Sequence, residues 1–560
     1  MKQALWITLA ICIYSSTVVK SQTAYEHVSN HDLYNFIDYL ATIHLIEVNT
    51  TIKPYSREQI AYWLTEADGQ RERLSKSQQK TLDIYLSEYA MERGLLKRGG
   101  GALVKDHEHL SLHILPPELT WRDSLFRTII RPIYGARYFA STNASFYHTY
   151  GGAEAIAYID ERWSVYASLR DNYQNKELLA RPSYLTQEPG GNYKFNVMGR
   201  EGGDYSEMRG GITYTWNWGS LGLIKDHIAW GDNNNGSNIF SGRAPSFPVI
   251  KLNLNPVSWL DFNYFHGWLT SMVIDSVNSY YVPGGQFRAT YYPKYIAANM
   301  YTFTPLRRLN FSIGNAIVYD NQNVHAGYLI PFFFFKSLTH TFNARILNNN
   351  SMMFMNISSR QIRHVHLYAS LYVDEFSITR VGDPDRHNFW SFKGGFSLEG
   401  WPLKDFRLIA ETTRTSPMTY QHRVPTTTFE TNNFNLGHYL RSNSMDYFVG
   451  ITYTPVSTLE IAAGYGYALK ANVYPYIYGT PDRLDEYPIL QDKTWTDETI
   501  KLRARMMPLP NLRIFAEYRH SHHKAYDVDG TDAESYLEMF SPAFLHGKTN
   551  TLIFGLALGI

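Results

Sequence analysis

From about residue 126 onward, apolar and polar residues alternate along the chain with a period of two. The clearest example flanks Pro508, where an alternating segment enters a proline turn and another leaves it. The charged positions of these two segments are Lys501, Arg503, Arg505, Arg513, Glu517 and Arg519. A period of two with proline confined to the turn predicts a β-hairpin. One apolar face and one charged face are typical of a membrane barrel, in which the charged face lines the lumen.

The proline turn is repeated along the chain. A proline, then Leu or Val, then two variable residues and Leu or Phe, begins at Pro256, Pro305, Pro402, Pro455 and Pro508, with gaps of 49, 97, 53 and 53 residues. Repeats at such a period have to be considered before any other feature. The alternation around three further positions, near Glu161, Gly219 and Arg360, indicates additional tight turns. The sequence therefore predicts eight tight connections in all.

Long polar segments, such as 171–209 and 415–444, lie between these turns. Short connections at one end and long ones at the other are typical of outer-membrane barrels. Eight turns with a first and a last strand predict a mainly β protein, a transmembrane antiparallel β-barrel of about 18 strands over residues 125–560. One apolar run, Tyr328–Phe335, falls inside a predicted long loop and has no place in this scheme.

The first hundred residues have a different pattern. Residues 1–22 resemble a secretory signal peptide with an apolar segment around Leu5–Tyr14. Residues 23–101 show helical periodicity behind the capping candidates Asn30, Ser56 and Ser75, and Ser56 with Gln59 predicts a capping box. Residues 102–124 are expected to form a linker. Both ends of the barrel segment fall on the tight-turn side, which places this small α-helical bundle in the periplasm.

Composition narrows the possible classes of protein. The formal net charge is +1, so the chain lacks the excess of basic residues that is typical of nucleic-acid-binding proteins. Aromatic residues make up 15% of the chain, enough for the two aromatic girdles of a membrane barrel. Beyond residue 22 no run of 18 apolar residues predicts a membrane helix. The only cysteine, Cys12, lies in the predicted signal peptide, so the processed chain is expected to have neither a disulfide nor a cysteine ligand.

Polar clusters give no positive case for an enzyme. His520, His522 and His523 precede three aspartates, and His364 and His366 lie on one strand face with Asp374, but polar loop and lumen residues explain both groups better than a metal site. Asp374 and Glu375 with Glu411 are the carboxylates available for glycoside hydrolysis, but nothing in the sequence fixes their separation, and lumen-facing charge explains them better. The prediction is a protein that is not an enzyme, with no metal and no cofactor.

The basic row of Lys501, Arg503, Arg505, Arg513 and Arg519 has two interpretations. Five cations on adjacent lumen-facing strands attract an anion, as in a channel for anionic or small solutes. Alternatively, carboxylates from other strands pair with them in a fixed network. The sequence does not decide between the two.

Five stretches resemble the capsule-assembly Wzi family in its Bacteroidetes-type form: Lys53–Arg57, Ile224–Pro248, Tyr372–Phe376, Glu411–His422 and Asn433–Tyr439. The resemblance runs over nearly the whole processed chain. It implies an 18-stranded outer-membrane barrel with a periplasmic helical bundle and a lectin-like role in holding capsular polysaccharide.

The loop with the best match supplies four candidate glycan-binding residues, Trp230, Asp232, Asn235 and Arg243. The main hypothesis is therefore a non-enzymatic outer-membrane protein that binds surface polysaccharide and helps to assemble or anchor a capsule. The alternatives are a porin-like channel and a scaffold for another surface or secretion assembly. The expected partners are outer-membrane lipid, capsular or surface polysaccharide and a periplasmic protein bound through the helical bundle.

Overall fold

The structure is a computed structural model that describes residues 22–94, 102–104, 109–114, 116–195, 201–341, 348–374, 377–476 and 483–559. Of the predicted signal peptide, only Gln22 lies within the described residues. Among the helices of these described ranges, none has both the length and the apolar character needed to span a membrane.

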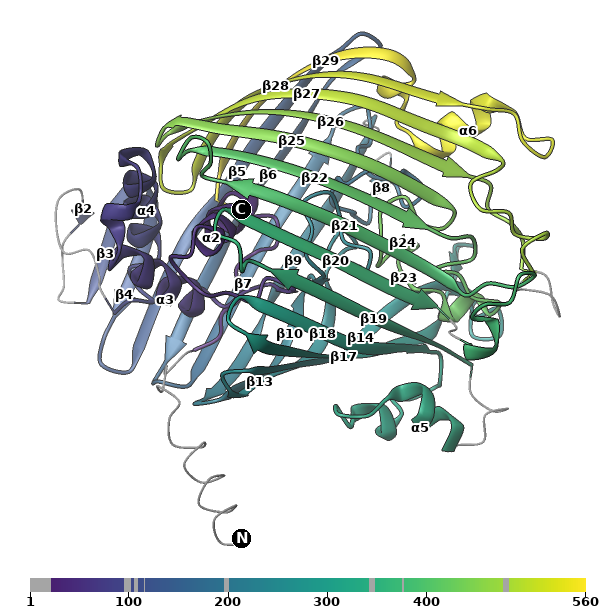
Figure 1. The fold of residues 1–560 in the computed structure, drawn as a ribbon, viewed down its shortest axis with the longest axis horizontal. Coiled ribbons are helices and arrows are strands. Elements are labelled where there is room, and N and C mark those ends of the chain that lie inside the picture. Colours follow the sequence, from purple (N-terminus) through teal and green to yellow (C-terminus); the bar gives the residue numbers. More distant parts are fainter. Residues whose placement is uncertain are drawn as a thin grey trace, which may run out of the picture.

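Eighteen antiparallel strands form a closed barrel, in agreement with the predicted fold class (Figure 1). The ring closes where β29 pairs with β5, at Thr551 opposite Ser141. The strands are β5 (Phe126–Ser141), β6 (Ser145–Ile159), β7 (Trp163–Gln174), β9 (Gly203–Trp216), β10 (Gly219–Asp226), β13 (Phe247–Val257), β14 (Leu260–Ile274), β17 (Tyr291–Leu306), β18 (Leu309–Tyr319), β19 (Asn349–Ser359), β20 (Val365–Asp374), β21 (Phe389–Glu399), β22 (Phe406–Thr415), β25 (Ser444–Val456), β26 (Leu459–Ala471), β27 (Lys493–Leu509), β28 (Leu512–Ala525) and β29 (Gly547–Leu558).

The eight predicted turn positions all fall in or beside connections at one end of the barrel, called here the turn end. The pairing register shifts beside Pro256, Pro305, Pro455 and Pro508. Proline has no N–H to donate to the ladder, so strands tolerate it at such bulges. Four of the five proline strings therefore mark a bulge that ends a strand, and the fifth, at Pro402, lies in the connection between β21 and β22. The long connections gather at the opposite end, called here the loop end.

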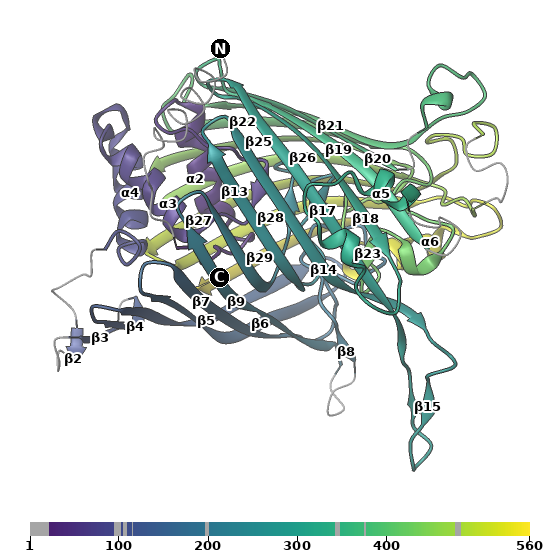
Figure 2. The same ribbon diagram turned by 90° about the horizontal axis from the view of Figure 1, so that it is seen from below.

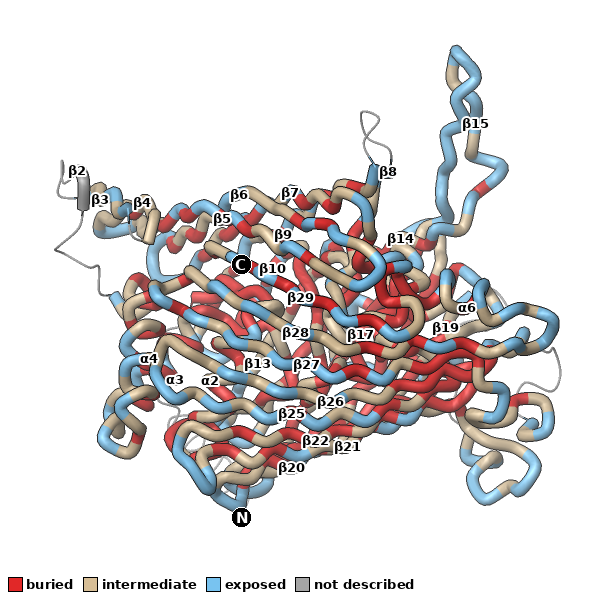
Figure 3. The backbone as a smooth tube through the Cα atoms, turned by 90° about the horizontal axis from the view of Figure 1, so that it is seen from above, coloured by how far each residue is buried: buried red, intermediate tan, exposed pale blue. Residues whose placement is uncertain are grey.

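Along each strand, side chains alternate between the lumen and the outer wall. On β27 the outer-wall side chains of Ile500, Leu502 and Met506 are 44–49% exposed, and Lys501, Arg503 and Arg505 lie between them in sequence. Figure 3 shows buried residues concentrated in the barrel and an exposed hairpin standing away from it. This hairpin, β15 (Tyr280–Tyr281) with β16 (Phe287–Arg288), extends the connection between β14 and β17 (Figure 2). An apolar outer wall over a polar lumen is the arrangement of a barrel in lipid.

Three helices form the N-terminal domain: α2 (His31–Thr42), α3 (Arg57–Asp68) and α4 (Lys76–Glu88). Ser56 caps α3 by accepting from the N–H of Gln59, but the reciprocal capping box occurs at Ser75 and Gln78 before α4. Apolar faces of the three helices pack into one core. In the predicted linker, β3 (Leu110–Ile114) and β4 (Pro117–Arg122) form a hairpin whose second strand pairs with β5. The segment thus continues the sheet instead of connecting it loosely, because β5 has a free edge before the barrel begins.

The N-terminal domain lies at the turn end and inserts into the lumen (Figures 1 and 2). Its charged side chains contact the barrel wall directly. Arg360, buried beside β19, pairs with Asp38 of α2 at 2.9 Å, and Arg513 of β28 pairs with Asp32 at 2.6 Å. On the other wall, Arg209 of β9 donates to the backbone carbonyl of Tyr25 at 3.0 Å. We call residues 22–94 the plug.

A second segment, residues 325–341, packs on the outer wall and is called the flap. Asn253 of β13 contacts Tyr25 in the lumen, so its side chain faces inward. Successive side chains of a strand alternate between the two faces, and directly paired residues of neighbouring strands share a face. The pairing register of β13, β14, β17 and β18 therefore puts Tyr264, Asn299 and Asn315 on the outer face. Asn299 donates to the carbonyls of Pro331 and Phe333 at 2.8 and 2.9 Å. The N–H of Phe335 donates to Asn315 at 2.9 Å.

The flap explains the apolar run that the sequence pattern could not place. Tyr328 and Phe335, in α5 (Phe335–Thr341) and the turn before it, are fully buried against β14, β17 and β18. Leu329, Ile330, Phe332, Phe333 and Phe334 are instead 40–54% exposed. The run covers polar groups on the outer wall with its backbone and turns its apolar side chains outward.

Candidate functional site

The segment 227–246, between β10 and β13, folds back into the lumen and is called the insert. It contributes β11 (Ala229–Trp230) and β12 (Phe240–Ser241), and β1 (Ile52–Lys53) of the plug completes a three-stranded sheet with them. Ile52 lies opposite Trp230 and Lys53 opposite Ala229. The plug and the best-matching loop therefore form one body within the barrel.

Trp230 is the centre of an aromatic cluster in the lumen. Its ring contacts Phe240, Phe265 of β14 and Phe354 of β19, with centroids 5.3, 5.2 and 6.0 Å away, and its exposed fraction is 0%. Phe429, from the long loop between β22 and β25, packs on Phe240 at 5.1 Å. Edge-to-face packing of this kind stabilises a fixed arrangement. Trp230 therefore holds the insert to the wall, and its ring is not available to a ligand in this conformation.

Asp232 fixes the insert to the plug. Its carboxylate accepts from Thr50, from Thr51 at 3.2 Å and from Asn356 of β19 at 2.8 Å. These bonds join three segments of the chain at one buried group. The sequence selected Asp232 as a glycan ligand, whereas in the structure its hydrogen-bonding capacity is used internally.

Glu411 of β22 anchors the next residues of the insert. Its two oxygens accept from the backbone N–H groups of Asn234 and Asn235 at 2.6 and 2.7 Å, and Lys393 pairs with it at 2.9 Å. The side chain of Asn235 donates to Asp446 at 2.7 Å. Asp374, the other carboxylate considered for hydrolysis, accepts from the N–H of Tyr420 at 2.9 Å. Both carboxylates therefore hold lumenal segments in position.

A cavity of about 560 Å³ lies between the plug, the insert and the strands β22 and β25–β28. This volume falls within the range of about 300–1,000 Å³ that is common for small-ligand sites. Two sets of predicted residues, far apart in the sequence, border it together. These are Asn235 and Arg243 from the insert and Lys501, Arg503 and Arg505 from the basic row.

The structure divides the basic row into two groups. Arg505 pairs with Asp32 and with Glu460 at 2.6 Å, and Arg513 also pairs with Asp32. Arg519 pairs with Glu517 at 2.8 Å on its own strand. Lys501 remains exposed, and Arg503, whose side chain is 41% exposed, lies 3.4 Å from Glu460. The fixed network thus holds Arg505, Arg513 and Arg519 closely and Arg503 more loosely, and Asp32 of the plug is the partner that the sequence could not identify.

The plug also contributes uncharged polar groups to the cavity. His31 of α2 borders it with an exposed side chain, and enclosure within the barrel, together with the nearby cations Lys53 and Arg503, lowers the pKa of its imidazole to about 4. Asn35 and Gln78 lie on the same side. Arg243 donates to the carbonyl of Tyr184 at 3.0 Å and lies over the ring of Phe434. The cavity therefore presents amides, a neutral imidazole and two partly exposed cations.

The other polar clusters from the sequence have structural partners. His523 lies 3.3 Å from Asp497 and 2.8 Å from Ser541, and His520 contacts Asn550. His364 contacts the backbone carbonyl of Glu399, and His366 contacts Ser358 and Arg360. Sequence reasoning missed a different group, His27, Glu207 and His227, which the fold brings together at the wall of the cavity. Their separation along the chain leaves no local pattern that could have identified them.

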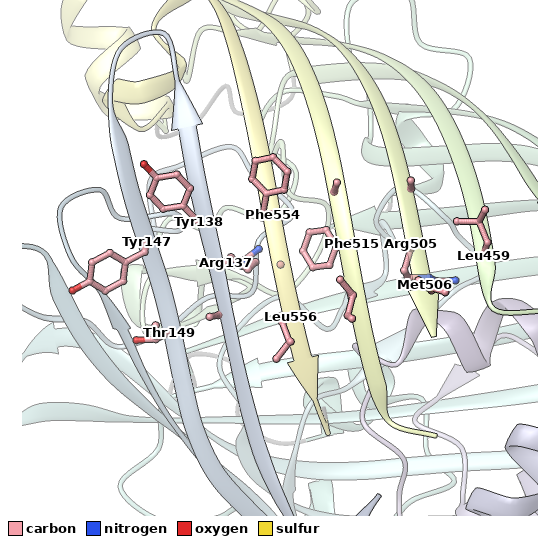
Figure 4. Close-up of a pocket in the computed structure, with 15 residues that line it drawn as sticks. Arg137, Tyr138, Tyr147, Thr149, Leu459, Arg505, Met506, Phe515, Phe554 and Leu556 are labelled. Carbon is pink, nitrogen blue, oxygen red and sulfur yellow. The ribbon is translucent and has the colours of Figure 1, made fainter. Parts of the chain in front are cut away.

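A second hollow, of about 520 Å³, lies on the outer wall across the seam between β5 and β29 (Figure 4). Exposed apolar side chains border it, including those of Tyr138, Met506, Phe554 and Leu556. The small residues Ala136, Ala504 and Ala516 make the wall shallow here. The position and character of the hollow suit hydrocarbon chains of lipid, so it offers no chemistry for a polar ligand.

A family model described as capsule assembly protein Wzi matches residues 139–535. The solved structure of Wzi, an outer-membrane protein involved in group 1 capsule assembly in Escherichia coli and described as a carbohydrate-binding β-barrel, superposes with a TM-score of 0.54 and 13% identity over 96% of this chain and 100% of that one. Pseudomonas aeruginosa OpdK with vanillate gives a TM-score of 0.42 at 10% identity, over 77% of this chain and 98% of that chain. No curated protein matches. Since the family model covers well over half of the chain and the fold agrees, the protein is an outer-membrane β-barrel that belongs to the Wzi family of capsule assembly proteins.

Proposed function

We propose that this protein is a non-enzymatic outer-membrane barrel that binds surface polysaccharide and helps to assemble or anchor a capsule. The observation that carries the proposal is the family match over residues 139–535. The filled lumen supports it. The plug, the insert and the loop around Phe429 share one buried aromatic cluster inside the barrel, an arrangement suited to holding a ligand at the surface rather than passing solutes. The channel alternative is not favoured.

The loop end offers the contact surface for the polysaccharide. The β15–β16 hairpin presents Tyr280 and Tyr281, 59% and 72% exposed, with Arg288 directly opposite Tyr280. Flat aromatic rings beside a cation suit an acidic sugar chain, because the ring covers the apolar sugar face and the cation attracts the carboxylate. Among the four loop residues selected from the sequence, Asn235 and Arg243 border the cavity and remain candidates for sugar contacts. Trp230 and Asp232 hold the insert that carries them.

Binding of purified capsular polysaccharide to the detergent-solubilised protein tests this function. We expect saturable binding, and we expect the double substitution of Tyr280 and Tyr281 by Ala to weaken it at least tenfold. Val277→Ala, at an 86% exposed position of the same hairpin, is the matched control. In cells, loss of the gene is expected to reduce the amount of attached capsule. An unchanged capsule together with no measurable polysaccharide binding would rule out the proposal.

We also propose that the plug contacts a periplasmic protein. Helix α3 carries Tyr62, 48% exposed, on a face that also bears the exposed residues Thr65 and Glu66. An exposed aromatic residue with a polar rim is a common feature of protein interfaces. Photocrosslinking from position 62 in living cells should capture a discrete partner, whereas position 83 on α4, also exposed, serves as the control site. Equal labelling from both positions would contradict a specific docking face.

A further inference from the structure

The hairpin of β3 and β4 occupies a stretch of β5 that β29 does not reach. β29 ends with Leu558 opposite Tyr134, and β4 takes the next part of the same edge, with Leu119 opposite Ile130. β3 then pairs with β4, so the hairpin lies beside β5 at the turn end (Figure 2). It therefore extends the sheet of the barrel wall without being part of the ring.

The inner face of this hairpin holds the end of the plug. Arg131 of β5 turns into the lumen and lies 3.8 Å from Glu88 and 3.4 Å from Glu118 of β4, so Glu118 also points inward. Arg122, on the same face by alternation, donates to the carbonyl of Gly94 at 3.0 Å. The pairing register puts three more polar residues on this face: Ser111, His113 and Thr120. The charged side chains of the two strands thus face the plug.

The outer face of the hairpin is apolar at every position. Its residues are Leu110, Leu112 and Ile114 of β3 and Pro117, Leu119 and Trp121 of β4. Leu112 and Ile114 are 38% and 46% exposed. An antiparallel sheet with one face in water normally carries polar residues on that face. A fully apolar exposed face is instead typical of a barrel wall in lipid.

This apolar face is continuous with the lipid-facing wall of the barrel. Leu119 lies directly opposite Ile130, and the alternate residues Pro132 and Tyr134 follow on the outer side of β5. Ile130 and Tyr134 are 41% and 53% exposed. Tyr134 in turn lies opposite Leu558, the last residue of β29. None of these residues is charged, so the hairpin and the wall present one uninterrupted apolar surface.

We propose that the outer face of the β3–β4 hairpin binds phospholipid of the periplasmic leaflet, with acyl chains packed on its leucine and isoleucine side chains. A soluble protein partner fits this face less well. Protein interfaces have a polar rim, whereas this face runs directly into the lipid-facing wall. The continuity of the two surfaces therefore favours the same medium, lipid, on both.

The tryptophan of the hairpin lies where a boundary between lipid and water is expected. Trp121 is next to the connection to β5 at the turn end, and its indole N–H donates to Asp123 at 3.2 Å. Tryptophan is enriched at this boundary because its ring contacts apolar chains while its N–H keeps a polar partner. Exposed tryptophans also lie in or beside tight connections of the ring, at Trp163, Trp218, Trp259 and Trp401. The hairpin thus follows the same pattern as the turn end of the ring.

Lipid on one face and the plug on the other give the hairpin a definite role. The contacts of Arg122 with Gly94 and of Glu118 with Arg131 join its inner face to the last part of the plug and to β5. Lipid bound to the opposite face holds the hairpin in place, and with it the point where the chain leaves the plug. This role is independent of the polysaccharide function proposed above.

Quenching of a fluorescent label by brominated phospholipid tests the proposal. The full processed protein is reconstituted in lipid-bilayer discs whose phospholipids carry bromine on their acyl chains. Cys12 lies in the predicted signal peptide, so the processed chain is expected to have no other thiol. A bimane label at Leu112→Cys should be quenched about as strongly as one at Val449→Cys on the outer wall. A label at Ser111→Cys, on the inner face, should be quenched at most about half as much.

Aqueous iodide should quench the labels at positions 112 and 449 far less than one at Val277→Cys, on the exposed loop-end hairpin. Heat-modifiable gel migration shows whether each variant forms a barrel, and Leu119→Cys repeats the measurement at a second outer-face position. Iodide quenching at 112 and 119 equal to that at 277 would place the face in water, open to a soluble protein, and would overturn the proposal. Bromine quenching that falls as the protein-to-lipid ratio rises would assign the face to a second copy of the chain and overturn it too.

Discussion

Two segments of this protein leave the strand ladder and pack on the barrel wall, one on each face. The plug lies in the lumen and is held by charged pairs such as Arg513–Asp32 and Arg360–Asp38. The flap lies on the outer face and is held by Asn299, Asn315 and the buried ring of Phe335. The same wall thus binds one segment with ions and the other with amides and apolar contacts.

The difference follows from the medium on each side of the wall. The lumen contains water, and a charge there can be partly solvated until its partner arrives. The outer face of the barrel meets lipid, where an unpaired charge or backbone group is far more costly. The outer-wall side chains of Asn299 and Asn315 are accordingly neutral and covered by the flap, which exposes phenylalanines above them. Each of the predictions below disrupts one side of this comparison.

The largest expected effect comes from Asp32→Ala in the plug. Removing this carboxylate leaves Arg513 and part of Arg505 without a counter-charge, at a cost of about 3–5 kcal/mol. A loss of 3 kcal/mol raises the open fraction of the plug by more than about 100-fold. The rate of native-state proteolysis within residues 22–94 measures it. Glu47→Ala, which breaks pairs of the 45% exposed Glu47 with Arg307 and Arg308, should change the rate less than about fivefold. Equal rates for the two variants would show that the plug is not held by its ion pairs.

The matching substitution outside is Phe335→Ala. The ring is fully buried between the flap and the wall, so its loss should cost about 3 kcal/mol and release the flap without loosening the plug. Hydrogen exchange of the amides in 325–341 measures the opening. Phe333→Ala, where the ring is 41% exposed, should leave exchange nearly unchanged. Faster exchange in the plug than in the flap would contradict the independence of the two segments.

Lowering the pH should loosen the plug before it loosens the flap. Glu26 of the plug pairs with Arg57 at 2.7 Å. Burial alone would raise the pKa of the Glu26 carboxyl, but the Arg57 charge and hydrogen bonds from Tyr89 and Asn30 hold that pKa well below its usual range. A lowered pKa contributes stability at neutral pH that is lost as pH falls below about 4, here about 1.5–3 kcal/mol for a charged hydrogen bond.

Hydrogen exchange across this pH range, corrected for its intrinsic pH dependence, should show the plug helices losing protection while the flap keeps it. The flap contacts described above use amides, carbonyls and a phenyl ring, which do not titrate there. In Glu26→Gln the acid-dependent part of the loss should shrink. Loss of flap protection first would overturn this assignment.

The smallest perturbation is Phe333→Cys with a nitroxide label in a lipid bilayer. Cys12 is the chain's only cysteine and lies in the predicted signal peptide, so no background label is expected in the processed protein. The label should collide more often with apolar molecular oxygen than with a water-soluble nickel complex. A label at Val449 on the outer wall should show the same preference. A label at Val277 on the exposed hairpin should show the reverse. A water-like label at position 333 would mean that the exposed flap phenylalanines do not face lipid.

Much of the barrel could be read from local patterns. Alternation is a property of a single strand, and each proline string marks a tight connection, four of the five with a bulge, so the turn end, the loop end and the strand number followed without any tertiary contact. The basic row was also found, because Lys501, Arg503 and Arg505 alternate on one strand. Its chemistry was not settled, because the partner of Arg513, Asp32, lies 481 residues away.

The sequence alone determined that these strands have one apolar and one polar face, which is enough to specify a barrel between lipid and water. Only the tertiary structure decided what fills and covers it. Trp230 and Asp232 were selected for a ligand and turned out to be buried anchors, and His27, Glu207 and His227 meet only when the plug is seated. Period and propensity act over a few residues, whereas these contacts depend on which distant segments the closed ring brings together.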